Sequence, residues 1–72
     1  MEIIVVKSFN SGNTYKLTIM EIKDTNKYKI VNLTTNKISK CTFNSYKDAL
    51  NDIYVYQSEG KNKVIETYKL LF

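Results

Sequence analysis

The sequence predicts an α+β fold, in which a small antiparallel β-meander of three to five strands is packed by one α-helix near residues 45–58. Two observations lead to this prediction. Up to residue 43, short runs of β-branched, aromatic and alternating residues are separated by turn-forming residues, which is typical of strands joined by tight turns. A serine-capped segment with apolar residues at helical spacing then follows. A chain of 72 residues has room for one small domain, residues 1–72.

The first strand is predicted from the unbroken β-branched run Ile3–Val6. A run without alternation is typical of a strand that is covered on both faces, so a central position in the sheet is expected. If this run instead lies at an edge of the sheet, its unpaired backbone can add a strand from a second copy. The sequence therefore leaves open a homodimer formed through Ile3–Val6.

Three further strands are predicted before the helix. From Thr14 the pattern alternates, with Tyr15 and Leu17 on one face and Lys16 and Thr18 on the other. The apolar register changes near Met20, which predicts a bulge or a twist. A third strand begins near Tyr28, and a fourth covers residues 38–43.

The helix is predicted to start at Ser45, because Ser45 and Asp48 have the spacing of a capping box. Ala49, Leu50 and Ile53 then follow at helical spacing, and Gly60 ends the helix. One alternative stops the helix at Ile53 and pairs residues 54–59 with residues 64–68 as a hairpin. The C-terminal segment is predicted as a strand or a short helix, since its apolar pattern suits both.

The composition argues against the commonest catalytic and metal-binding chemistries. All eleven basic residues are lysines, and the chain contains no histidine, arginine or tryptophan. Without histidine, Cys41 and the serines lack their usual activating base, and the carboxylates show no metal-ligand spacing. We therefore expect no enzymatic activity, no cofactor and no metal. A lone cysteine and the lack of a long apolar run predict a cytoplasmic protein outside the membrane.

A net charge of +4 and a sheet that carries lysines favour nucleic acid as the partner. If strands two to four form a meander with the helix on one face, Lys16, Lys29 and Lys40 fall on the opposite, open face, with Thr18 and Thr42 between them. Lysines can bind the phosphate backbone there. These three lysines are the predicted nucleic-acid-binding residues.

The segment from Phe43 to Ala49 follows three predicted strands and opens a capped helix. This pattern, over residues 14–57, resembles the small arm-type DNA-binding domain of phage integrases. That family places a three-stranded sheet in the major groove of DNA and follows it with a helix. The resemblance implies sheet-mediated DNA binding, although this chain lacks the arginines that such sheets commonly use, and no site residue is transferred from it.

The sequence thus predicts a small, non-enzymatic, basic binding module. Its excess of Lys, Asn, Ile and Tyr, which have A/T-rich codons, indicates a low-GC genome, and the expected source is a phage or mobile element of a low-GC bacterium. The alternative is a protein-binding inhibitor or accessory protein, for example a phage inhibitor of a host defence nuclease such as an anti-CRISPR. Aromatic residues favour protein contacts, so Tyr54, Tyr56 and Tyr68 are the predicted partner-binding residues in that case. The partner is then a nucleic-acid-handling protein.

Overall fold

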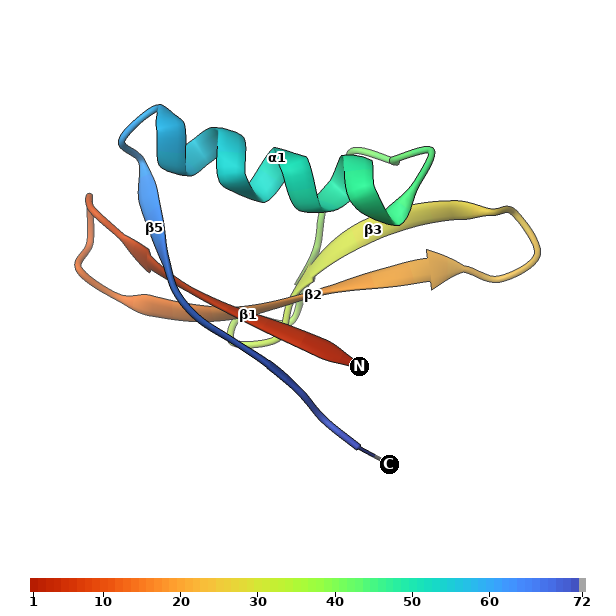
Figure 1. Cartoon of the computed structure of the whole chain (residues 1–72), viewed down its shortest axis with the longest axis horizontal. Helices are drawn as coiled ribbons and strands as arrows, with labels where there is room; N and C mark the ends of the chain where they lie inside the picture. The colour runs from red at the N-terminus through yellow and green to blue at the C-terminus, as the bar shows by residue number, and fades with distance from the viewer. Residues whose placement is uncertain (72) are drawn as a thin grey trace.

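The computed structural model describes residues 1–71 and has an α+β fold, with one helix lying across one face of a five-stranded antiparallel sheet (Figure 1). The strands lie side by side in the order β4-β3-β2-β1-β5, so that the first four form a meander and the last returns beside β1. The elements in chain order are β1 (Glu2–Ser8), β2 (Thr14–Ile22), β3 (Lys27–Asn32), β4 (Lys37–Ile38), α1 (Tyr46–Ser58) and β5 (Asn62–Lys69).

Strand β1 lies inside the sheet and pairs with β2 on one side and with β5 on the other. Its β-branched run is buried on both faces: Ile4 and Val6 belong to the core beneath α1, while Ile3 and Val5 point to the other face and are 1% and 8% exposed. The predicted central position is therefore confirmed. Because both edges of β1 are already paired, the homodimer route through Ile3–Val6 lacks the free edge that it requires.

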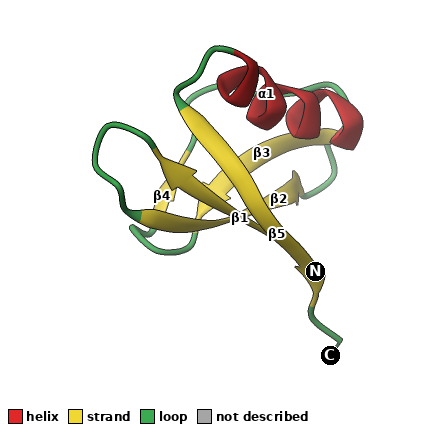
Figure 2. Cartoon of the chain, turned by 60° about the vertical axis from the view of Figure 1, so that its left-hand side comes forward, coloured by secondary structure: helices red, strands yellow, loops and turns green. Residues whose placement is uncertain are grey.

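The core lies between α1 and the sheet. Ile4, Val6 and Ile19 contribute from the strands, and Ala49 and Ile53 contribute from the helix. A surrounding shell of half-buried apolar residues completes it: Tyr15, Leu17, Tyr28, Ile30, Phe43, Leu50 and Val64. Figure 2 shows that the helix covers only one face, so the other face of the sheet has no second layer above it.

Helix α1 has the predicted start and end. The Ser45 side chain accepts a hydrogen bond from the Asp48 backbone N–H at 3.0 Å, as expected for an N-cap. The helix continues to Ser58, so the hairpin of residues 54–59 does not form. Gly60 follows the C-cap with a φ of +72°, a left-handed conformation that glycine adopts without a steric penalty.

Replacing Ser45 by alanine should lower the free energy of unfolding by about 1 kcal/mol, because the Asp48 N–H loses its acceptor. Chemical denaturation measures this loss. Ser45→Asp is the matched control, since a carboxylate can cap the same N–H and should keep most of the stability. An alanine variant as stable as the wild type would show that the cap contributes nothing.

Two sequence predictions about the sheet are wrong. The fourth strand was predicted over residues 38–43, yet β4 holds only Lys37 and Ile38, and Phe43 makes an isolated bridge with Tyr28. The cause is Ser39, whose hydroxyl accepts the hydrogen bond from the Ile30 backbone N–H, where a regular ladder would use a backbone carbonyl. The chain leaves the sheet at that point.

The second wrong prediction is the bulge expected near Met20. Strands β2 and β3 pair in continuous register through Met20. The register shift lies instead between Val5 and Val6 of β1, where β5 carries one extra residue, Ile65. A bulge of this kind bends an edge strand and increases its twist.

Candidate nucleic-acid interface

The candidate interface is the face of the sheet opposite α1, here called the open face. Residues paired across antiparallel strands share a face, so the register shows which side chains belong to it. Lys16 pairs with Val5, and Lys29 pairs with Met20, two positions along β2 from Thr18. The structure therefore places Lys16 and Lys29 on the open face with Thr18.

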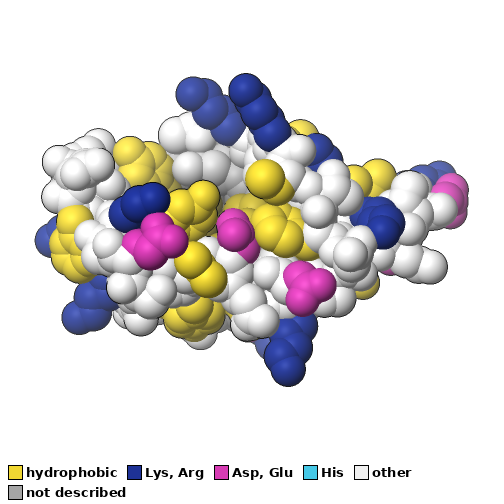
Figure 3. Space-filling model, turned by 90° about the horizontal axis from the view of Figure 1, so that it is seen from above, with side chains coloured by type: hydrophobic (Ala, Val, Ile, Leu, Met, Phe, Trp, Pro, Cys, Tyr) yellow, Lys and Arg dark blue, Asp and Glu magenta, His cyan; other side chains and the backbone are white. Residues whose placement is uncertain are grey.

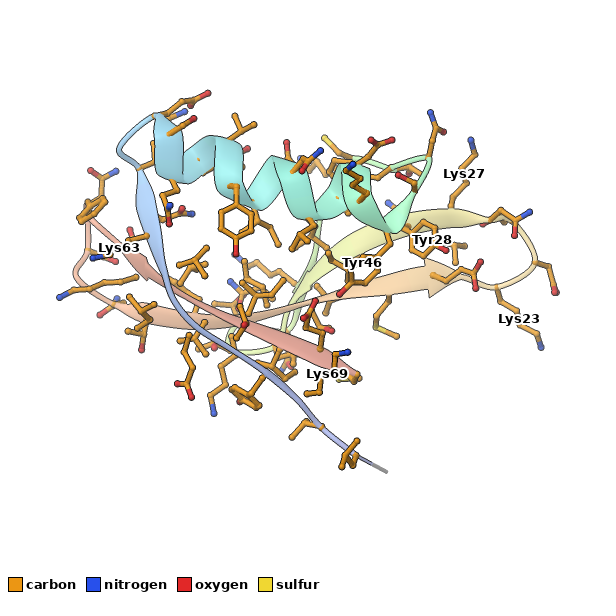
Figure 4. All side chains as sticks on the ribbon, in the orientation of Figure 1. Lys23, Lys27, Tyr28, Tyr46, Lys63 and Lys69 are labelled. Atoms are coloured by element: carbon orange, nitrogen blue, oxygen red, sulfur yellow. The ribbon has the colours of Figure 1, made fainter. Side chains whose placement is uncertain are left out.

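Two lysines that the sequence reasoning missed lie on the same face. Lys7 is two residues after Val5 on β1, and it pairs directly with Lys63 of β5. Lys16 lies diagonally across from Lys7, on the other neighbouring strand. We call Lys7, Lys16 and Lys63 the lysine corner. Figure 4 labels Lys63, at the start of β5.

The lysine corner brings three positive charges together, and Glu66, which pairs with Val5 on the same face, places one negative charge beside them. Neighbouring strands are about 4.8 Å apart, and like charges directly opposite each other on two strands destabilise a sheet. All three side chains are exposed. The salt bridge found within residues 1–71 joins the Lys61 Nζ to a Glu59 carboxylate oxygen at 3.0 Å. No lysine of the corner takes part in a salt bridge within these residues. Such an arrangement is suited to an anion that neutralises several lysines at once.

Lys29 is on the open face but is partly engaged. Its Nζ donates a hydrogen bond to the Ser39 carbonyl oxygen at 3.1 Å. It also pairs with Met20, which is four positions along β2 from Lys16. Lys29 is therefore less available to a ligand than the lysine corner.

An apolar belt crosses the open face beside the lysine corner. The register aligns one residue from each strand, in the order Ile38, Val31, Thr18, Ile3 and Tyr68. Thr18 is fully buried, and its hydroxyl donates to the Glu2 carbonyl oxygen at 2.7 Å, which satisfies the polar group inside the belt. Ile38 at one end is 64% exposed. The open face is therefore basic at one corner and apolar across the middle.

Lys40 does not lie on the open face, contrary to the sequence prediction. It follows β4 in the irregular segment and lines a hollow of about 590 Å³ on the helix side of the sheet. Leu17 and Ile30 contribute apolar surface to this hollow, and Asp52 of α1 lies beside it. Figure 3, which views the helix side, shows apolar atoms exposed between charged side chains there. Thr42 is likewise outside the strands.

The three tyrosines predicted to bind a partner are not gathered on one surface. Tyr54 and Tyr56 are both exposed on α1, but two residues of a helix are separated by about 200° around its axis. Tyr56 lines the hollow and lies 5.3 Å from the Lys61 Nζ, in a cation–π contact. Tyr68 belongs to the apolar belt of the open face.

A tyrosine–carboxylate pair joins α1 to the sheet away from the open face. The Tyr46 hydroxyl donates a hydrogen bond to the Glu2 carboxylate, and the Tyr46 ring contacts Tyr28 edge-on, with centroids 6.3 Å apart. Figure 4 shows Tyr46 beside Tyr28 beneath the start of the helix. Burial, the hydrogen bond to Glu2 and its negative charge together raise the pKa of Tyr46 to about 12.

This shift predicts a loss of stability at high pH. The folded state holds the Tyr46 proton more tightly than the unfolded state, where the pKa is 10.0, so the stabilisation is complete below that pH and is lost as the pH rises toward 12. Denaturant unfolding of the wild type and of Tyr46→Phe at about pH 9 and about pH 11.5 tests this. The two pH values lie below and above the tyrosine pKa of the unfolded state, which is about 10. The wild type should lose more stability than the variant, whereas parallel losses would contradict the linkage.

The described residues hold no cluster of three or more histidine, cysteine or acidic side chains that could ligate a metal ion. Within the same residues, no helix has the length and apolar character needed to cross a membrane. The single cysteine, Cys41, is exposed and has a free thiol.

The fold and the open face define a class: a small α+β protein with one helix on one side of its sheet and a basic, partly apolar surface on the other. Comparison of the chain with protein-family models, curated proteins and solved structures finds no match. The resemblance to phage integrase domains gains no support from these comparisons. The functional argument therefore depends on the geometry of the open face.

Proposed function

We propose that this chain is a non-enzymatic binding module that contacts the nucleic-acid backbone through the lysine corner of its open face. The observation that carries the proposal is the contiguous, exposed and unpaired set Lys7, Lys16 and Lys63. Flexible ammonium groups bind phosphates as point charges, without needing the planar geometry of arginine. The net charge of +4 adds long-range attraction for a polyanion.

The apolar belt limits the kind of nucleic-acid contact that the face can make. Tyr68 is the aromatic residue of the belt, so a row of stacked bases has little support from the described side chains. Contacts to the sugar–phosphate backbone therefore dominate the proposed interface. Backbone contacts position a protein on nucleic acid but do not read its sequence, so weak sequence preference is expected.

The salt dependence of binding tests this proposal. Labelled single- and double-stranded oligonucleotides are titrated with the protein and followed by fluorescence anisotropy. Three lysine–phosphate contacts predict a slope of about −3 for the logarithm of the duplex affinity against the logarithm of salt concentration. The affinity should then fall roughly 40-fold between about 50 and 200 mM salt. Absence of binding at about 50 mM salt would overturn the proposal.

A second candidate function is protein binding, and the apolar belt favours it. Ile38 and Tyr68 are at the two ends of a row that has no second layer over it, and exposed Met20 lies next to this row on β2. Aromatic and methionine side chains are enriched in protein interfaces. An accessory or inhibitory protein that docks on a nucleic-acid-handling partner would use the same face. Protein that binds no oligonucleotide but is recovered with such a partner would support this second function.

A further inference from the structure

Strand β5 is the long edge of the sheet, and only part of its outer side is protected. Figure 2 shows β5 at the border of the sheet, crossing in front of β1. Near the start of β5, the Val64 backbone N–H donates a hydrogen bond to the Gln57 side-chain oxygen at 2.7 Å. The bulge at Ile65 follows directly. A side chain that occupies a backbone N–H and a β-bulge each prevent another strand from pairing with an edge. They protect the first half of β5.

The second half of β5 has free backbone groups. The backbone N–H and C=O groups of Met1 and Leu70 are hydrogen-bonded to each other, at 3.3 and 2.8 Å. Because these groups alternate in direction along a strand, the N–H and C=O groups of Leu70, Tyr68 and Glu66 point toward β1. Tyr68 is accordingly bonded to β1. The N–H and C=O groups of Thr67 and Lys69 point outward, and no hydrogen bond within residues 1–71 uses them.

Exposed apolar side chains flank this free edge. Ile65 is 49% exposed and Leu71 is 94% exposed, on either side of Thr67 and Lys69. Unprotected edges with apolar neighbours readily pair with another strand. The edge therefore has both the hydrogen-bonding groups and the apolar surface that an added strand needs.

We infer that β5 pairs antiparallel with β5 of a second copy of this chain, about a two-fold axis beside Tyr68. A two-fold axis through a continuous antiparallel sheet places one residue opposite its own copy. With Tyr68 at that position, Thr67 of each copy exchanges hydrogen bonds with Lys69 of the other. Ile65 of each copy then lies beside Leu71 of the other, which covers the exposed apolar side chains.

The charges on β5 disfavour the neighbouring registers. An axis beside Glu66 would place Glu66 opposite its own copy and Lys63 opposite Lys69, and like charges directly opposite destabilise a sheet. An axis beside Lys69 pairs that lysine with itself. An axis beside Thr67 avoids these repulsions but sets Lys69 against Ile65, which leaves the apolar residues uncovered. The register about Tyr68 avoids like-charge pairs and pairs apolar residues with each other.

Disulfide trapping tests both the pairing and its register. In a Cys41→Ser background, single cysteines are placed at Glu66, Thr67 and Tyr68, with Val55→Cys, exposed on α1, as the control for random collisions. In the inferred register, Tyr68 faces its own copy in a non-hydrogen-bonded pair, whose Cα atoms lie about 4.5 Å apart and therefore within the Cα range of a disulfide. Under mild oxidation, Tyr68→Cys should form covalent dimer at least tenfold faster than the other three variants. Faster trapping at Glu66 or Thr67, or equal trapping at Val55, would overturn the inference.

The mass of the untrapped protein provides a second measurement. The contact is small, so dissociation in the range of about 10 to 1,000 μM is expected. Light scattering should show a mean mass that rises with concentration toward the dimer. Leu71→Lys should reduce the dimer fraction at least fivefold, while Ile38→Lys at the other end of the sheet should not change it. A mass that stays monomeric at millimolar concentration would overturn the inference, which does not depend on nucleic-acid binding.

Discussion

Truncating Ile53 to alanine should lower the free energy of unfolding by about 2–5 kcal/mol. Ile53 is 2% exposed, on the side of α1 that packs against Ile4, Val6 and Ile19. Its removal costs the transfer free energy of the lost methylene and methyl groups and leaves a cavity. A domain of this size is stabilised by roughly 4–11 kcal/mol, so the loss is a large share of the total. Thermal unfolding should shift down by at least about 8 °C.

Val55→Ala is the matched control on the same helix. Val55 is exposed, and alanine has the higher helix propensity, so this variant should stay within about 0.5 kcal/mol of the wild type. Circular dichroism followed during urea titration measures both variants. If Ile53→Ala were as stable as Val55→Ala, α1 would not be packed against the sheet as described.

The parts of the fold that could be predicted from the sequence are those set by local patterns. Alternation identified β2 with Lys16 and Thr18 on one face, and the β-branched run identified β1 as an interior strand. Ser45 and Gly60 marked the helix ends, because capping depends on residues within one turn of each end. These features require no knowledge of the tertiary structure.

The parts that could not be predicted depend on contacts between distant residues. The residues that follow Ile38 look like a strand by composition, yet the Ser39 hydroxyl takes the hydrogen bond of Ile30 and the strand ends there. Lys40 therefore lies on the helix side of the sheet and not on the open face. No local signal shows whether a side chain or a carbonyl will satisfy a given N–H.

The lysine corner illustrates the same limit for the candidate site. Alternation along β1 places Lys7 on the face of Ile3 and Val5, so this lysine could have been found from the sequence. Lys63 could not, because its position opposite Lys7 depends on β5 returning beside β1 and on the bulge that sets the register. The strongest feature of the site thus arises from two segments at opposite ends of the chain.

Replacing Lys7, Lys16 and Lys63 together by glutamine should weaken oligonucleotide binding at about 50 mM salt at least a hundredfold. Each lysine that neutralises a phosphate releases a counterion, so the loss of three contacts should also bring the salt slope close to zero. Stability should not fall, because the directly opposed lysines Lys7 and Lys63 repel each other in the free protein. A lower affinity with an unchanged melting temperature is the signature of a binding surface.

The control variant carries Lys23→Gln, Lys37→Gln and Lys47→Gln, which removes the same charge from exposed positions outside the open face. Figure 4 shows Lys23 at the far end of the sheet from Lys63. If the net charge alone attracts nucleic acid, both triple variants should bind equally weakly, because long-range attraction depends on the summed charge. If the lysine corner is the contact surface, the control should keep a slope of about −3 and lose only a few-fold in affinity. Equal loss in the two variants would therefore remove the open face from the proposal, even though nucleic acid is bound.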